Sequence, residues 1–443
     1  MRSWRNVLGR LAALGPIVTA CDAGSAGSSR PQPRVVVRWE ERRQHITGFG
    51  ASSAWTAPAL SKELADRFFS AESGIGLSLL RVRIAPDGTT GEVETARAAM
   101  ARGARVWAAP WSPPGEWKAR PQSSEQARLF DTSQGLFGGR LSKEHYADWA
   151  RQLAGFVKSV EEQGIELMAL SVQNEPDYEA PWETCRFTPE ELTEFVRDHL
   201  IPALAAEGLD TPLLAPEATG WSAVARYADP LLADATTRAA IRFVATHGYN
   251  GSPHAYAAPT EHGKEFWQTE VSEDDGPAGD TGMESGSRLG ILIHDDLTRG
   301  NVNAWHYWWL LPRTDVQTVS NSALVQDGVL TRRAYVLGNF SRFVRPGSVR
   351  VETAPAAPGN NVHVSAYRSS DAGELVIVAV NASAVDVEQA FELDGVGVAE
   401  LTPWLTSEDA ALEPGEPVAV EGATFQYTLP TRSVTTFVGA VIP

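Results

Sequence analysis

The sequence contains few cysteines, fewer basic than acidic residues and no long apolar run, and each shortage argues against a class of protein. Its 443 residues include only two cysteines, Cys21 and Cys185, so we expect no structural disulfide within a mature chain and no cysteine-based metal site. The formal net charge of −17 argues against a nucleic-acid partner, because phosphate binding needs a basic surface. No apolar run is long enough for a transmembrane helix. A neutral polymer fits this composition.

Tryptophan is plentiful by contrast, with 14 residues against only 4 methionines. Indole rings are costly to bury completely, and a flat apolar face at a strand end can meet a ligand. Each ring also fits ordinary core packing. The candidates that lie at or just past predicted strand ends are Trp55, Trp111, Trp117, Trp182 and Trp309.

The amino-terminal segment has the pattern of an export signal. "MRSWRNVLGR" carries three arginines, "LAALGPIVTA" is a short apolar run, and Cys21 follows small residues. This order resembles a bacterial lipoprotein signal, with residues 1–21 as the signal segment, Cys21 as the lipidation site and residues 22–34 as a flexible linker. A plain secretory signal cleaved nearby is the alternative. We therefore expect an extracytoplasmic protein that meets a membrane only through Cys21.

Residues 47–342 alternate apolar strands with amphipathic helices, which predicts an α/β fold of the (β/α)8 barrel type. One helix, within 143–164, places a run of apolar side chains on one face, and "TPEEL" begins another with a capping box from Thr188 to Glu191. The predicted strands lie at 45–55, 77–85, 105–111, 165–176, 212–221, 243–250, 265–272 and 302–311.

After this region the pattern changes to short strands separated by Gly, Pro, Asn, Asp and Ser. Residues 345–443 therefore predict an antiparallel β-sandwich attached to the barrel. The strand-like segment 35–46 precedes the barrel and is expected to add a strand to the sandwich.

Two carboxylates stand at matching places in the predicted barrel. Glu175 follows the fourth strand in "LSVQNEPDY", and Glu270 ends the seventh in "FWQTEVS". Strands four and seven lie across the mouth of a (β/α)8 barrel, where active sites are found. Two facing carboxylates about 5–5.5 Å apart can perform retaining glycoside hydrolysis. The alternative for each is a solvated loop carboxylate.

Other polar residues lie near the same strand ends. Asn174 could reach a sugar hydroxyl, and Arg81 and Arg83 can face the barrel interior, where an arginine keeps a nucleophile ionised. His247 fits either a binding or a core role. Two further strand-end carboxylates, Glu217 and Asp87, are interpreted as loop or salt-bridge residues.

Long motifs of this chain resemble glycoside hydrolase family 30, especially its bacterial glucuronoxylanase branch. They are "GFGASSAW", "GIGLSLLRVRIAPDG", "PWSPPGEWK", "LSVQNEPDY", "FWQTEVS", "FVRPGSVRV" and "RSVTTFV". The resemblance spans about residues 35–440 and implies a (β/α)8 barrel with a β-sandwich tightly attached. It also implies Glu175 as acid/base, Glu270 as nucleophile and Tyr249 as a residue that holds Glu270 in place.

One departure from that branch concerns substrate choice. Glucuronoxylanases have an aromatic–Ile–Arg–Arg sequence after the double tryptophan of strand eight, and its first arginine clamps the glucuronate branch. Here Pro312 occupies that position in "WWLLPRTDVQT", and Arg313 follows. Ser272 also stands where the branch usually has tyrosine. Proline cannot make the bidentate carboxylate contact of an arginine, so we expect weak or no glucuronate dependence unless Arg313 substitutes.

We therefore predict a retaining endo-β-1,4-xylanase that acts on a polysaccharide, as a monomer and with no cofactor or metal ion. The acidic loop 272–286 lacks an EF-hand pattern and is expected to be a solvated loop. Two alternatives stay open. The same machinery could cut β-1,6-galactan or β-1,6-glucan, or the chain could be a catalytically silent glycan-binding protein.

Overall fold

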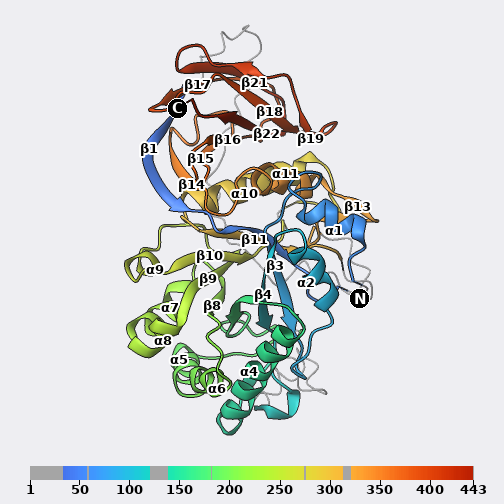
Figure 1. Cartoon of the computed structure of the whole chain (residues 1–443), viewed down its shortest axis with the longest axis vertical. Helices are drawn as coiled ribbons and strands as arrows, with labels where there is room; N and C mark the ends of the chain where they lie inside the picture. The colour runs from blue at the N-terminus through green and yellow to red at the C-terminus, as the bar shows by residue number, and fades with distance from the viewer. Residues whose placement is uncertain are drawn as a thin grey trace, which may run out of the picture. The chain divides into compact units, whose positions relative to one another are not determined.

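Eight parallel strands close into a barrel in the computed structural model, which describes residues 33–56, 59–119, 138–180, 182–273, 276–312 and 321–442 (Figure 1). The strands follow one another around the barrel in chain order, and they confirm the predicted (β/α)8 fold. They are β2 (Gly48–Ser52), β3 (Leu79–Ile84), β4 (Arg105–Pro110), β7 (Leu167–Ser171), β8 (Leu213–Gly220), β9 (Ile241–Asn250), β10 (Glu265–Glu270) and β11 (Ala304–Trp309).

Amphipathic helices connect these strands and bury their apolar faces. The longest, α4, begins at Tyr146, and its buried side chains include Trp149 and Phe156 on the face that the sequence predicts. Helix α5 starts with the predicted capping box between Thr188 and Glu191. The described α-helices are α1 (Lys62–Phe69), α2 (Val93–Met100), α4 (Tyr146–Glu162), α5 (Pro189–Phe195), α6 (Ile201–Ala206), α7 (Val224–Ala233), α8 (Ala235–Ala240), α9 (Ala258–Glu261), α10 (Met283–Thr298) and α11 (Arg332–Ser341).

The sandwich is built from one continuous ten-stranded sheet whose inner faces share a separate apolar core. Its strands are β1 (Val35–His45), β14 (Val349–Ala354), β15 (Val362–Arg368), β16 (Glu374–Asn381), β17 (Val387–Asp394), β18 (Glu400–Thr406), β19 (Ala411–Pro414), β20 (Val418–Ala419), β21 (Thr424–Leu429) and β22 (Ser433–Ala440). The segment before the barrel, β1, pairs antiparallel with β14 and parallel with β17. The parallel pair departs from the antiparallel expectation, because β1 and β17 are distant in sequence and no hairpin fixes their direction.

Helices α10 and α11 attach the barrel to the sandwich. Asn339 of α11 donates hydrogen bonds to the Trp404 carbonyl at 3.0 Å and to Thr436 Oγ1 at 3.0 Å. On α10 a side chain at Gly290 would place its Cβ 3.1 Å from Val380 of β16, so glycine permits the close approach. The two parts therefore share a buried, hydrogen-bonded interface.

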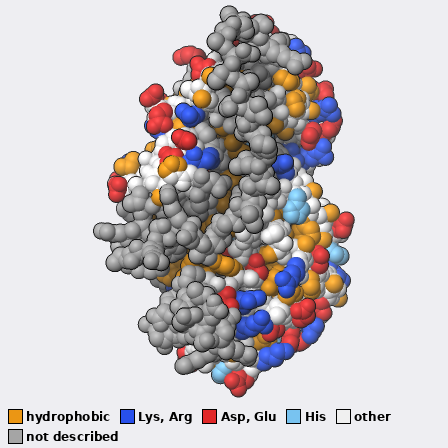
Figure 2. Space-filling view, turned by 180° about the vertical axis from the view of Figure 1, so that it is seen from behind, with side chains coloured by type: hydrophobic (Ala, Val, Ile, Leu, Met, Phe, Trp, Pro, Cys, Tyr) orange, Lys and Arg blue, Asp and Glu red, His pale blue; other side chains and the backbone are white. Residues whose placement is uncertain are grey.

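The remaining described strands form two short two-stranded antiparallel sheets, β5 (Lys118–Ala119) with β6 (Arg140–Leu141) and β12 (Val325–Gln326) with β13 (Val329–Leu330). Among the described residues, no helix is both long and apolar enough to span a membrane. Acidic and basic side chains are interspersed on the described part of the face seen in Figure 2.

Candidate active site

The backbone bends sharply where the polar residues follow the barrel strands. After β7 ends, the Asn174 amide donates to the Pro110 carbonyl at 2.9 Å, and the Glu175 amide donates to the Glu217 carbonyl at 3.0 Å. Glu175 and Glu217 both adopt left-handed backbone angles, with φ of 48° and 59°. Such angles are costly for residues with a side chain and are concentrated at functional sites. They fix both carboxylates at the mouth of the barrel.

Glu175 and Glu270 face each other across this mouth. An oxygen of each carboxylate and a ring nitrogen of His247 all lie within 4.8 Å of one another. Both glutamates are nearly buried, at 5 % and 6 % exposure. Retaining glycosidases hold their two carboxyl groups about 5–5.5 Å apart, whereas inverting enzymes need about 6.5–9.5 Å to admit a water. The observed separation fits the retaining geometry.

Glu270 is held by donors on both of its oxygens. Tyr249 Oη donates to Oε1 at 2.9 Å, and Arg81 Nη1 donates to Oε2. Burial is the largest influence on the pKa of Glu270 and raises it, the charges of His247 and Arg81 oppose this effect, and the charge of Glu175 adds to it. The net result is a pKa of Glu270 above its usual value.

Arg81 is the central cation of the site. Its fully buried guanidinium also donates to Asn174 Oδ1 at 2.6 Å and forms an ion pair with Glu217 Oε1 at 2.5 Å. Its face lies over the Trp111 ring, with 4.4 Å from Cζ to the ring centroid. Arg81 therefore links Glu270, Asn174 and Glu217 in one rigid network.

His247 is the second cation of the site. Its Nδ1 lies 3.0 Å from Glu175 Oε1, and its Nε2 lies 3.4 Å from Glu217 Oε1 and 3.7 Å from Glu270 Oε2. Burial lowers the pKa of His247, but the three carboxylates outweigh it and raise the pKa to about 10. The ring is therefore protonated at neutral pH and donates a hydrogen bond to Glu175.

A charge count explains how this cluster holds one proton on a carboxyl group. Three buried carboxylates, of Glu175, Glu217 and Glu270, surround the two cations Arg81 and His247. With every group ionised, the cluster has one net negative charge, which is unfavourable in a buried site. One bound proton neutralises it. The arrangement therefore supplies a protonated carboxyl group beside an ionised one, which acid-assisted glycoside cleavage requires.

An aromatic group borders these charges. The rings of Trp55 and Trp111 have centroids 5.0 Å apart, and Trp308 and Trp309 stack at 4.8 Å. Trp55 and Trp309 are partly exposed, whereas Trp111 is only 2 % exposed and packs mainly on Arg81. Trp117, also partly exposed, stacks on His145 at 5.6 Å. Trp55 and Trp309 are thus better placed than Trp111 to meet a sugar ring.

Arg83 follows Arg81 by two residues on β3 but does not join the charged cluster of the active site. Its Nη2 contacts both carboxylate oxygens of Glu183 at 2.9 and 2.6 Å, and its guanidinium lies 4.8 Å over the Trp55 ring. Trp182 packs against Tyr178 at 6.1 Å. Arg83 and Glu183 therefore form an ion pair beside Trp55, outside the charged cluster.

Sequence reasoning undervalued Glu217. It is completely buried and receives hydrogen bonds from Ser171 and His247, so it is a salt-bridge residue within the site rather than a loop carboxylate. A carboxylate within a predicted barrel strand was the available signal. Asp87 instead accepts a hydrogen bond from the Thr89 amide at 3.0 Å and stabilises a turn.

The residues that the sequence links to substrate choice and to lipidation are only partly described. Ser272 is 7 % exposed and Pro312 is partly exposed. Arg313 and Cys21 lie outside the described residues.

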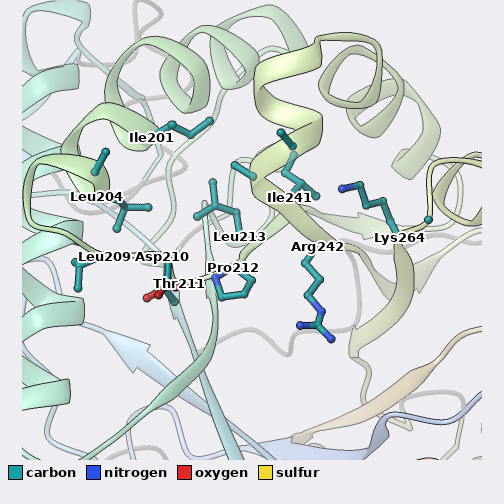
Figure 3. A pocket seen from close by; sticks show the side chains of 14 residues that line it. Ile201, Leu204, Leu209, Asp210, Thr211, Pro212, Leu213, Ile241, Arg242 and Lys264 are labelled. Atoms are coloured by element: carbon teal, nitrogen blue, oxygen red, sulfur yellow. The ribbon is translucent and has the colours of Figure 1, made fainter.

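A hollow away from the active-site carboxylates is shown from close by in Figure 3. This cavity of about 450 Å³ is bordered by residues that precede or begin strands, including Leu213, Ile241 and Lys264. Its described lining contains apolar, aliphatic and charged side chains but no aromatic ring for sugar stacking. The strand-end carboxylates do not line it, so this hollow is not the candidate active site.

Comparisons with known proteins agree with the geometry. The profile of the glycosyl hydrolase family 30 TIM-barrel domain matches residues 92–292, and that of the family 30 beta sandwich domain matches residues 347–437. Glucuronoxylanase XynC of Bacillus subtilis (strain 168) is 32 % identical over 414 residues, which cover 91 % of this chain and 91 % of that protein.

Two solved structures are also similar over most of their length. A GH30 endoxylanase from Clostridium papyrosolvens has a TM-score of 0.78 and 31 % identity, covering 92 % of this chain and 100 % of its own. A family 30 subfamily 8 xylanase from Clostridium acetobutylicum has a TM-score of 0.79 and 30 % identity, covering 92 % and 99 %. The chain belongs to glycosyl hydrolase family 30.

Proposed function

We propose that this protein is an endo-β-1,4-xylanase that cleaves the xylan backbone with retention, using Glu270 as the nucleophile and Glu175 as the acid/base. The observation that carries the proposal is the pair of buried carboxylates whose oxygens lie within 4.8 Å across the barrel mouth. The xylanases among the similar proteins support xylan as the substrate.

The first half of the reaction uses the proton held by the cluster. Glu175 donates it to the glycosidic oxygen while a carboxylate oxygen of Glu270 attacks the anomeric carbon, so that a covalent glycosyl–enzyme forms and the leaving sugar departs. Arg81 and Tyr249, which hold Glu270 in the free enzyme, fix the attacking group. Asn174 accepts a hydrogen bond from Arg81, and we assign to it the contact with the sugar 2-hydroxyl.

In the second half, Glu175 works as a base. It accepts a proton from water, the water oxygen attacks the anomeric carbon, and the bond to Glu270 breaks. Protonated His247 stays hydrogen-bonded to Glu175 and stabilises the carboxylate that forms between the two steps. The enzyme then returns to its starting protonation state.

The test is reducing-sugar release from a panel of glucuronoxylan, arabinoxylan, β-1,6-glucan and β-1,6-galactan. We expect cleavage of both xylans and little release from the β-1,6-linked polymers. Activity confined to a β-1,6-linked polymer would replace the substrate assignment but keep the two carboxylates. Binding of xylan without any hydrolysis would mean a silent glycan-binding protein.

We further propose that glucuronate branches are not required. Pro312 has no charged donor, and Arg81 and Arg83 are already engaged with carboxylates. An arginine clamp contributes roughly 1.5–3 kcal/mol through charged hydrogen bonds, or about one to two orders of magnitude in preference. Mass spectrometry of the limit digest of glucuronoxylan should therefore show no fixed glucuronate position. A single ladder with one glucuronate at a constant position would assign the clamp to Arg313 or another base.

The amino-terminal pattern supports a further proposal, that Cys21 is lipidated after export. Three arginines, a short apolar run and small residues precede this cysteine. Labelling with a radioactive fatty acid in a bacterial host should mark the protein, and Cys21→Ser should abolish the label. Recovery of a soluble mature protein whose first residue is not Cys21 would favour plain secretion.

A further inference from the structure

A second cluster of side chains that can bind a metal ion lies outside the active site, between α10 and β15. One ring nitrogen of His294, one of His363 and a carboxylate oxygen of Asp295 lie within 4.8 Å of one another. His294 and Asp295 are on α10, the helix between β10 and β11 of the barrel, which packs on α11 and β15, and His363 is on β15 of the sandwich (Figure 1). The cluster therefore joins the two parts of the molecule.

The hydrogen bonding of this cluster is incomplete. His294 is 3 % exposed, and its buried Nδ1 has no hydrogen-bond partner among the residues that the structure describes. The two imidazole rings meet edge to face, with centroids 5.2 Å apart, and His363 Nε2 has only a long contact of 3.3 Å to Asn361. A buried polar atom without a partner is costly, so an occupant that bonds to it would be stabilising.

We propose that His294, Asp295 and His363 bind a divalent transition-metal ion, for which Zn²⁺ is the best-fitting representative. Two imidazoles and one carboxylate, with water in the fourth position, are a common zinc ligand set. Donors about 2.0–2.1 Å from a tetrahedral zinc lie about 3.3 Å apart, so side chains within 4.8 Å need to close by no more than about 1.5 Å.

The protonation of the histidines suits this role. Burial lowers the pKa of His294 to about 3 and also lowers the pKa of His363. Both rings are therefore neutral at physiological pH, which is the form that binds a metal ion.

Two nearby arginines limit the affinity. Arg299 Nη1 forms an ion pair with Asp295 Oδ2 at 3.1 Å, but its side chain is 64 % exposed and can turn into the solvent. Arg350 faces the cluster and is held by Gln44 and Asn301. Their positive charge opposes a divalent ion, so we expect weaker binding than at sites with cysteine ligands.

The bound ion would link a barrel helix to a sandwich strand. Because the unfolded chain does not hold these ligands together, binding would favour the folded state. At free zinc about 100 times the Kd, the folding equilibrium should shift about 100-fold toward the folded protein. The site is thus proposed to stabilise the attachment of the sandwich.

The experiment is isothermal titration of the tag-free full chain, stripped with EDTA and dialysed, with ZnCl₂. We expect one site in the wild type and at least a tenfold weaker Kd in His363→Ala and in Asp295→Asn. His262→Ala removes an exposed histidine on another element and should bind zinc as the wild type does. Thermal unfolding with zinc should show a Tm increase in the wild type and in His262→Ala but not in His363→Ala.

The catalytic cluster of Glu175, His247 and Glu270 also contains possible ligands, so Glu270→Gln serves as the second control. Zinc binding that persists in Glu270→Gln and is lost in His363→Ala supports the proposal. Binding that is lost in Glu270→Gln and kept in His363→Ala, or no zinc binding by the folded wild type, would overturn it. Circular dichroism and xylan hydrolysis by metal-free His363→Ala verify that this variant is folded.

Discussion

At the mouth of the barrel, Arg81, Glu217 and His247 are completely buried yet charged, whereas the sandwich core is filled by rings such as Phe391 and Phe425, which stack at 4.5 Å. Both regions exclude water. In the sandwich each buried group adds to stability through the removal of apolar surface from water. At the barrel mouth each charge must be paired, and the network that pairs them also places one proton beside Glu270. The buried charges at the barrel mouth therefore serve catalysis at a cost in stability, whereas the sandwich core contributes to stability.

The largest effect should follow from removal of either facing carboxylate. Glu270→Gln and Glu175→Gln should each lower kcat on xylan by about 10³-fold or more, because the nucleophile or the proton donor is lost. Thermal unfolding should change little, since each amide keeps the shape of the side chain. The exposed Glu261→Gln on α9 is the matched control and should retain full activity.

Azide provides an independent check on the nucleophile. In Glu270→Gly it should restore turnover and give a product of inverted configuration. A Glu270→Gln enzyme with more than a few per cent of the wild-type kcat would contradict the assignment.

The next effect concerns the dependence of stability on pH. His247 has a pKa of about 10 in the folded protein and about 6.5 when unfolded, so its protonation stabilises the fold fully below about pH 6.5. This contribution, on the order of a few kcal/mol, is lost as the pH rises toward 10. Urea unfolding at several pH values should therefore show a steeper alkaline loss of stability in the wild type than in His247→Gln. Parallel curves would mean that His247 is not the proton-binding cation of the cluster; His262→Gln should follow the wild type.

A smaller effect is expected at Tyr249. Its phenol donates to Glu270 Oε1 at 2.9 Å, and a hydrogen bond to a charged group contributes about 1.5–3 kcal/mol. Tyr249→Phe should reduce kcat by roughly 10–100-fold with a smaller change in KM, because the contact is to the nucleophile and not to the substrate. Wild-type kcat in this variant would show that Arg81 alone is sufficient to hold Glu270.

The smallest effect on activity should come from the sandwich core. Ile377→Val removes one methylene from a completely buried side chain and should cost about 0.5–1.5 kcal/mol of unfolding free energy. Below the unfolding transition, kcat and KM on xylan should equal those of the wild type. A changed kcat in a fully folded Ile377→Val protein would contradict the separation of stability from chemistry between the two regions.

The sequence was sufficient to predict the barrel, the sandwich and the facing positions of Glu175 and Glu270, because strand periodicity places both residues at carboxyl ends of strands. It was not sufficient for the finer network. Arg81 and Arg83 share one strand face, and only the distance of each from the strand end decides that Arg81 meets Glu270 while Arg83 meets Glu183. No sequence period encodes such a distance.

Other parts of the site depend on long-range packing. The inward direction of Glu217 follows from a left-handed backbone angle within β8, which strand propensity does not predict. Trp111 follows the end of β4, as the sequence predicts, but the guanidinium of Arg81 covers its ring. Likewise, His294 and His363 come together only because α10 packs on β15.

The central claim is that Glu175 and Glu270 act together in a double displacement. Proton NMR of the anomeric region during the first minutes of hydrolysis of a linear xylo-oligosaccharide, faster than mutarotation, tests it most directly. The account predicts that the new reducing end appears first as the β-anomer, since two inversions restore the configuration of the β-linked substrate. Initial appearance of the α-anomer would show a single displacement by water and would contradict the nucleophile role of Glu270.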